Sequence, residues 1–428
     1  MRALLLLILS LGSGTYQHLW AKDVQPVLPT IPERVLDVKD FGAVGDGKTD
    51  DAPAIQKAIN KAGSQGGGTV RLSKGTYLSG PLTLVSHLRL QLDAGVILMM
   101  LPLDRYPGGN KNPADFISAK GLSDLAIVGE GTIEGQGTPW WPFAKDKDKK
   151  RPRMVSIHDC ARILVEGVTL KNSPMFHLAM RADEVTVAKV KIWAPSSKDP
   201  HNPSHNTDAC DVSGHNILVT DCDVSVGDDN YTCGRDTSNV LIKNCRYGTG
   251  HGVSIGSYTQ GEVSNITVRD CVFDGTECGI RIKSDRDRGG HVHHLVYENL
   301  QMKNVDMPIL IYAAYGAKAK PFRDLQKISP ETALTYPTQA VEATTPLYED
   351  ITFRNITATV TAGHRAGLIW GLPEAPVGQL VLENVTITAD LPLGFYFVKQ
   401  ATLKAVKVVT PAGENKFAEA AAKLTVTP

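Results

Sequence analysis

A short pattern repeats along most of the chain, and it constrains the fold more than any other feature. Each copy is an alternating, β-branched segment followed by a turn residue, as in "HNILVTDCDV" and "SNITVRDCVF", which is typical of a half-buried strand. Most steps between copies are about 22 to 32 residues, which predicts one coil of a parallel β-solenoid. The first apolar residues of successive copies are Ile163, Val185, Ile217, Val240, Ile266, Leu295, Ile351 and Leu380.

Such a coil cannot bury its apolar face alone, so neighbouring coils, about 4.8 Å apart, must stack into a continuous core. The first coil would expose this core and a backbone edge unless something covered it. The segment "DDAPAIQKAINKAG" predicts a capping helix, with Asp51 as N-cap, Ile55, Ile59 and Ala62 on one face, and Gly63 at its end. We therefore expect an all-β parallel solenoid with an N-terminal helix.

The first residues have the order of a secretory leader: Arg2, then a short apolar run, then small and polar residues. The apolar run is shorter than the roughly 20 residues that span a bilayer. We expect a signal peptide over residues 1–21, with the cleavage point left open, and a single domain over residues 22–428. The mature protein should be a monomer, extracellular or periplasmic, without membrane attachment.

The charge of the chain is balanced, with 45 basic and 45 acidic residues among 428. This balance favours neither a nucleic-acid partner nor an anionic membrane. Seven cysteines in an exported chain could form three disulfides and leave one thiol. However, Cys222, Cys245 and Cys271 each follow the first apolar residue of a copy by five positions, which favours a stacked ladder of small side chains.

Three carboxylates, Asp208, Asp228 and Asp229, lie in the runs "NTD" and "GDD". Aligning the strands that follow puts Asp208, Asp229 and Gly252 level in successive coils, with Asp228 and His251 one residue earlier. Because a coil advances by only about 5 Å, these side chains should form one patch. Crowded carboxylates repel one another, which keeps one protonated beside an ionised one, as hydrolysis of a glycosidic bond requires. Turn-forming aspartates are the alternative interpretation.

The neighbours of these carboxylates strengthen the catalytic interpretation. In "GIRIKSD", strand alternation turns Ile280 and Ile282 inward and Arg281 and Lys283 outward, onto the surface that carries the aspartates. A guanidinium beside an ammonium suits a substrate carboxylate. In "GTGHGVSIGS", the flanking glycines would let a sugar approach the backbone and leave the imidazole of His251 free to tune an aspartate.

Other segments carry weaker signals. The run "KDKDKKRPR" over residues 145–153 is most simply a solvated loop, with binding of an anionic substrate as the alternative. A long insertion follows Tyr315, and insertions of this length are usually functional or mobile. The triplet His291, His293 and His294 lies at a turn into the next copy, so we predict no metal site there.

The residues quoted above resemble the polygalacturonase family of glycoside hydrolases, family 28. The resemblance covers nearly the whole mature chain, from "DFGAVGDGKTDDAPAIQKAIN" through "GTIEGQGTPWW" and "NSPMFHL". Its most specific part is the set "NTD", "GDD", "GHG" and "RIK", four triplets in family order. It implies a right-handed, single-stranded parallel β-helix that hydrolyses the α-1,4-linked galacturonan of pectin with inversion, and it implies no metal or organic cofactor.

The same resemblance implies roles for single residues. Asp228 would be the general acid, Asp208 and Asp229 would hold and activate the attacking water, and His251 would support the protonation state of the acid. The residues that would contact the sugar are Arg281, Lys283, Tyr315 and Asn206.

The chain also departs from the family pattern. Fungal members place a cysteine directly after the paired aspartates, where this chain has Asn230, so the disulfide known there is not expected here. The segment "APSSKDPHNPSHNTD" is longer than usual and, with the insertion after Tyr315, could shape one end of a cleft. Three alternatives remain open at this point: a hydrolase of xylogalacturonan or rhamnogalacturonan, a calcium-dependent pectate lyase, and a non-catalytic solenoid that binds polysaccharide.

Overall fold

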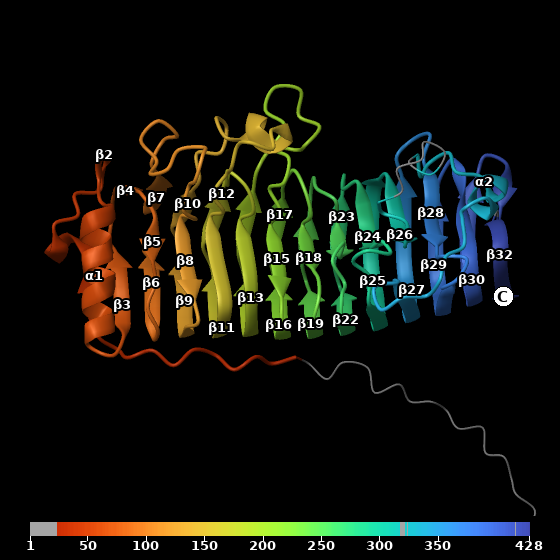
Figure 1. Cartoon of the computed structure of the whole chain (residues 1–428), viewed down its shortest axis with the longest axis horizontal. Coiled ribbons are helices and arrows are strands. Elements are labelled where there is room, and N and C mark those ends of the chain that lie inside the picture. Colours follow the sequence, from red (N-terminus) through yellow and green to blue (C-terminus); the bar gives the residue numbers. More distant parts are fainter. Residues whose placement is uncertain (1–23, 317–321, 323, 416) are drawn as a thin grey trace, which may run out of the picture.

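The computed structural model describes residues 24–316, 322, 324–415 and 417–428, so the expected signal peptide lies outside the described residues. The chain winds into a solenoid whose coils lie side by side along the long axis of the molecule (Figure 1). In the described part, the strands pair in parallel, apart from β30 (Leu391–Thr410) with β31 (Gly413–Glu414). None of the helices there is long and apolar enough to span a bilayer.

The strands form three rows, which we call the site row, the second row and the third row. The site row contains β5 (Leu82–Thr83), β8 (Ile117–Lys120), β15 (Cys210–Ser213), β18 (Tyr231–Cys233), β21 (Val253–Ile255), β24 (Cys278–Lys283), β26 (Met307–Tyr312) and β28 (Arg365–Trp370). The second row contains β1 (Val35–Asp37), β3 (Gly68–Leu72), β6 (Leu88–Leu92), β9 (Ser123–Gly129), β16 (His215–Thr220), β19 (Thr237–Lys243) and β22 (Glu262–Arg269). The third row contains β2 (Asp46–Asp50), β4 (Thr76–Ser79), β7 (Ile97–Met100), β10 (Thr132–Glu134), β12 (Thr169–Lys171), β14 (Lys191–Trp193), β17 (Asp223–Ser225), β20 (Arg246–Tyr247) and β23 (Val272–Asp274).

Longer strands bend from one row into the next and tie the rows together. Those that join the site row to the second row are β11 (Val155–Glu166), β13 (Leu178–Ala188) and β32 (Phe417–Thr427), and β30 continues into the third row. Those that join the second row to the third row are β25 (His291–Val305), β27 (Leu347–Val360) and β29 (Val377–Thr388).

The observed register confirms the repeat predicted from the sequence. The predicted first apolar residues are Cα partners from coil to coil, and each is at most 2% exposed. The cysteine ladder is also observed: Cys245 lies between Cys222 and Cys271, and hydrogen bonding to Cys245 raises the pKa of both outer thiols. All seven cysteines are free and buried. The ladder therefore contributes apolar packing to the core.

Asparagine side chains form a second ladder at the corner between the second and third rows. The Nδ2 of Asn355 donates to Oδ1 of Asn299 at 3.0 Å, and the Nδ2 of Asn384 donates to Oδ1 of Asn355 at 2.8 Å. These residues have φ between 53° and 54°, a left-handed conformation that asparagine tolerates better than most residues. Asparagine therefore suits this corner for two reasons: it tolerates the left-handed backbone conformation, and its side-chain amide hydrogen-bonds to the neighbouring coil.

The predicted capping helix is α1 (Ala52–Ser64), and its apolar face covers the first coils at the end of the solenoid (Figure 1). Ile55, Ile59 and Ala62 are fully buried, as expected. Asp51 is the N-cap residue, as predicted, but its side chain makes no capping hydrogen bond to the helix. Its carboxylate instead accepts hydrogen bonds from the backbone N–H groups of the loop at Val44 and Gly45, at 2.7 and 3.0 Å.

Candidate active site

The starts of successive site-row strands carry the predicted site residues to one place. Cys210 of β15 pairs with Tyr231 of β18, which pairs with Val253 of β21, which in turn pairs with Ile280 of β24. A cleft of about 600 Å³ opens over these strands. It is lined by all eight predicted residues: Asn206, Asp208, Asp228, Asp229, His251, Arg281, Lys283 and Tyr315.

The register differs by one residue from the prediction at His251. Tyr231 pairs with Val253, and counting back two residues on each strand gives Asp229 and His251. His251, rather than Gly252, therefore lies level with Asp229. Gly252 also approaches the neighbouring coil closely: it has φ +78°, and a Cβ there would lie 2.1 Å from the carbonyl oxygen of Cys278. This glycine therefore makes room for the neighbouring coil.

Asp228 lies between a histidine and an asparagine. Its Oδ1 is 2.9 Å from Nδ1 of His251 and accepts the backbone N–H of Asp229, while its Oδ2 accepts the backbone N–H of Asn206 at 3.2 Å. Burial opposes ionisation, but the hydrogen bond from His251 and the charges of His251, Arg281 and Lys283 hold the pKa of Asp228 below its usual value. The surroundings of Asp228 therefore favour its ionised form.

Asp229 is held by two cations. Its Oδ2 is 2.9 Å from Nζ of Lys283, and its Oδ1 pairs with the guanidinium of Arg281 and accepts from Ser254 Oγ at 2.9 Å. The two cations lie side by side on the carboxylate surface, as predicted, and Ile280 and Ile282 point into the core. The two cations do not face solvent, because the side chains of Arg281 and Lys283 are only 12% and 7% exposed.

Asp208 has the opposite surroundings. Its side chain is buried, and its Oδ1 has no hydrogen-bond partner among the described residues. Burial raises the pKa of Asp208 well above its usual value, and the negative charges of Asp228 and Asp229 raise it further. The crowding predicted from the sequence is present, and it raises the proton affinity of Asp208.

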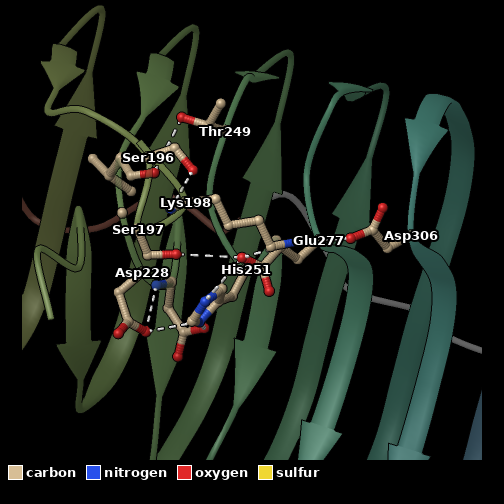
Figure 2. Close-up of polar contacts among 12 residues, drawn as sticks. Ser196, Ser197, Lys198, Asp228, Thr249, His251, Glu277 and Asp306 are labelled. Carbon is tan, nitrogen blue, oxygen red and sulfur yellow. Dashed lines mark hydrogen bonds and ion pairs between the residues drawn. The ribbon is translucent and has the colours of Figure 1, made fainter. Parts of the chain in front are cut away.

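Figure 2 shows a chain of charged side chains behind His251. Nε2 of His251 lies 3.6 Å from Oε1 of Glu277, and this oxygen is 3.5 Å from Nζ of Lys198. Lys198 also pairs with Asp306 at 2.9 Å, and Ser197 Oγ donates to Glu277 at 3.3 Å. Both Ser197 and Lys198 belong to the long segment before "NTD", which therefore reaches across the coils to the rear of the imidazole.

Two further residues at the cleft were missed from the sequence. Asp211 of β15 lines the cleft, and burial raises its pKa to about 6. Arg151 donates to Oδ1 of Asn206 at 2.8 Å, which leaves the amide Nδ2 of Asn206 facing Asp228 Oδ2 at 3.4 Å. Strand alternation could have found Asp211, because it faces outward like Arg281. Only the folded loop brings Arg151 to the site.

Tyr315 stands at the rim of the cleft, with its side chain 42% exposed and its ring centroid 5.4 Å from Nζ of Lys283. The insertion that follows it contributes no other cleft-lining residue in the part that the structure describes. There it packs away from the site: α2 (Pro330–Leu334) lies near the C-terminal coils, and Tyr336 contacts Trp370 at a centroid distance of 5.3 Å. The expectation that this insertion shapes one end of the cleft stays a prediction.

The histidine triplet forms ion pairs with acidic residues of neighbouring coils, at 2.7 Å for His291 with Glu349 and 3.4 Å for His294 with Asp350. Among the described residues, the only three-residue group whose ligand atoms converge as a metal site would require is Asp228, Asp229 and His251. The two cations that contact Asp229 oppose a further positive ion there.

Comparisons with known proteins agree with this arrangement. The model of the glycosyl hydrolases family 28 matches residues 70–408. An endo-polygalacturonase of Pectobacterium carotovorum subsp. carotovorum is 33% identical over 389 residues, which cover 82% of this chain and 86% of that protein. An exopolygalacturonase of Zea mays is 31% identical, with 83% and 84% covered.

Two solved structures extend the comparison to the fold. The polygalacturonase from Erwinia carotovora ssp. carotovora superposes with a TM-score of 0.69 at 30% identity and covers 88% of this chain and 97% of that chain. The hyperthermoactive exopolygalacturonase from Thermotoga maritima has a TM-score of 0.72 at 21% identity, with 92% and 94% covered. The expected right-handed parallel β-helix is confirmed, and the chain belongs to the glycosyl hydrolases of family 28.

Proposed function

We propose that this glycoside hydrolase cleaves α-1,4-linked galacturonan with inversion, with Asp228 as general acid and Asp208 and Asp229 as the groups that hold and activate water. One observation carries the proposal. Three carboxylates in contrasting electrostatic surroundings share a cleft with Arg281 and Lys283, which suit the carboxylate of a uronic acid. The relatives of known name act as endo- or exo-polygalacturonases.

Proton delivery from Asp228 requires substrate in the cleft. Without substrate, the charges of His251, Arg281 and Lys283 favour the ionised carboxylate. A galacturonate carboxylate beside the two cations would offset their charge, which raises the proton affinity of Asp228. His251, whose Nδ1 is 2.9 Å from Oδ1 of Asp228, would support the protonated acid in this position. Substrate binding thereby favours the protonated form of Asp228, which is the form that can act as general acid.

Water activation falls to the other two aspartates. The paired cations offset the charge of Asp229, which suits an ionised group that accepts a proton from water. Asp208 keeps its proton more readily and, as a residue that lines the cleft, can orient the same water through its carboxyl group. Asn206 and Tyr315 would contact the sugar from opposite ends of the site, and no cofactor takes part in this mechanism.

The acid assignment is tested by Asp228→Asn. Asparagine keeps the shape but cannot donate a carboxylic proton, so reducing-end release from polygalacturonate should fall at least about 100-fold. Circular dichroism and the melting temperature should stay close to wild type. Retention of wild-type turnover by this variant would refute the assignment.

A time course of product sizes separates the remaining modes of action. A ladder of oligomers means endo cleavage, and monomer alone from the start means exo cleavage. Defined xylogalacturonan and rhamnogalacturonan oligomers test the decorated substrates. A chelator-sensitive rise in ultraviolet absorbance would indicate a lyase, and binding without turnover would indicate a non-catalytic solenoid. We also propose that the mature protein is an exported monomer, which N-terminal sequencing and light scattering would check.

A further inference from the structure

A second cavity lies beside the catalytic cleft and takes no part in the mechanism above. Its volume is about 630 Å³, and the two cavities adjoin, because Arg153 and Asn206 line both. Its walls come from the loop at residues 112–115, from Met175, and from the segment at residues 143–153. The 143–153 segment begins in the short helix η2 (Trp141–Lys145) and stands among the loops at one edge of the sheet (Figure 1).

This cavity is basic. It is lined by five cations but only two carboxylates, Asp115 and Asp146. Asp115 pairs with Arg153 at 3.5 Å. The other four cations, Lys147, Lys149, Lys150 and Arg151, have no ion pair with a carboxylate in the part of the chain that the structure describes. A pocket with this excess of positive charge attracts anions.

Arg151 is fixed in place without a carboxylate partner. Its guanidinium donates to the backbone oxygens of Pro174 and His205, at 3.1 and 2.7 Å, and to Oδ1 of Asn206 at 2.8 Å. The segment is also tied to the neighbouring loop, because the backbone N–H of Lys150 donates to the oxygen of Asn110 at 2.8 Å. The cations are therefore presented by a positioned loop.

We propose that this pocket, called here the basic pocket, binds the carboxylate of a second uronate unit of the same polysaccharide chain, away from the bond that is cleaved. The inference rests on the proposed function. A polymer that occupies both cavities binds more tightly than one that occupies the cleft alone, because once one uronate is bound the second binds intramolecularly, at a high effective concentration. The lysines supply point charge to an anion at the mouth of the pocket, and the guanidinium supplies a fixed charge deeper within it.

The test compares substrates of two lengths. In Lys149→Gln/Lys150→Gln, KM for polygalacturonate should rise about three- to tenfold, as expected for two exposed charge contacts, with kcat nearly unchanged. KM for the shortest oligogalacturonate that the wild type cleaves should not change. The matched control is Lys399→Gln/Lys423→Gln, which removes two exposed lysines from the C-terminal strands and should leave both values as in the wild type.

Two results would overturn the basic pocket: an unchanged KM for polygalacturonate, or an equal rise in KM for long and short substrates. Calorimetric titration with polygalacturonate, in an Asp228→Asn background, repeats the comparison without turnover. If the wild type cleaves no galacturonan, the proposed function fails. The titration then decides separately whether the two lysines bind the polymer.

Discussion

Asp208 illustrates how catalysis and stability oppose each other at a single residue. Burial and two nearby carboxylates raise its pKa in the folded protein. A raised carboxyl pKa favours folding below the unfolded pKa, about 3.8, and this contribution is lost as the pH rises through the folded value. The wild-type fold is thus destabilised near neutrality by a group to which the proposed mechanism assigns a role in activating water.

Asp208→Asn should therefore be more thermostable than the wild type at pH 7 while losing hydrolytic activity. The difference in melting temperature should shrink as the pH falls towards 4, which calorimetry across this range would measure. Asp124→Asn is the control of opposite sign, because hydrogen bonds from Arg162 lower the pKa of Asp124. It should be less stable than the wild type at pH 7. A lower melting temperature for Asp208→Asn at pH 7 would contradict the interpretation.

A second prediction concerns the charges around His251. Oε1 of Glu277 is 3.6 Å from Nε2 of His251 and 3.5 Å from Nζ of Lys198, so the two side chains place opposite charges near the imidazole. We expect kcat/KM to fall on the alkaline side of its pH profile when the Asp228–His251 pair loses its proton. Glu277→Gln should shift this alkaline fall to a pH about half a unit lower. Lys198→Gln should move it higher. The groups that face His251 directly are Asp228, Asp229, Glu277 and Arg281.

Shifts in the same direction for both variants would show that the two residues act only through the structure of the loop. Activity should be measured with the shortest substrate that is cleaved, so that binding at the basic pocket does not contribute. Circular dichroism would confirm that each variant keeps its fold.

Sequence reasoning was most successful where the repeat itself positions a side chain. Strand alternation placed Arg281 and Lys283 beside Asp229, and the repeat spacing placed Asp208 level with it. It was wrong by one residue at His251, because the observed pairing of Tyr231 with Val253 places His251, and not Gly252, level with Asp229. Arg151 was missed because its loop approaches the site from outside the repeat. Glu277, by contrast, directly precedes β24 and is level with Gly250, so the repeat itself could have indicated it.

At the scale of an element, the corner ladder explains why asparagine recurs. Asn355 and Asn384 of this ladder each stand in an Asn-x-Thr motif, yet both have positive φ and donate to an asparagine of the preceding coil. Asn265 stands in a third such motif and does the same at a different corner, directly before the second-row residue Ile266. Asn230 stands in a fourth such motif but is only 1% exposed. The motif thus follows from the corner geometry, and the sequence alone could not separate this cause from glycosylation.

Asn355→Ala should lower the free energy of unfolding by about 1–3 kcal/mol, because it loses two amide hydrogen bonds and places alanine at positive φ. Asn355→Gly is the matched control, since glycine adopts this backbone conformation freely. It should be destabilised less than the alanine variant. Urea unfolding of both variants measures the difference, and equal losses would show that backbone conformation has no part in the effect.

For the whole molecule, stability depends on contacts between neighbouring coils. Each coil of a solenoid contacts mainly the coils on either side, so damage at one end need not reach the centre. The end coil depends on α1, whose residue Ile59 is fully buried against it. This arrangement separates the catalytic coils, which begin more than a hundred residues later, from the cap.

Ile59→Asp should open the N-terminal coils locally, because an unpaired buried charge costs several kcal/mol. Hydrogen exchange should show lost protection over residues 52–100, while residues 208–283 stay protected and activity persists at low temperature. Lys57→Asp introduces the same side chain on the exposed face of α1 and should leave exchange unchanged. Loss of protection in all coils together would instead mean that the solenoid unfolds as one cooperative unit, so that the cap stabilises the distant active site directly.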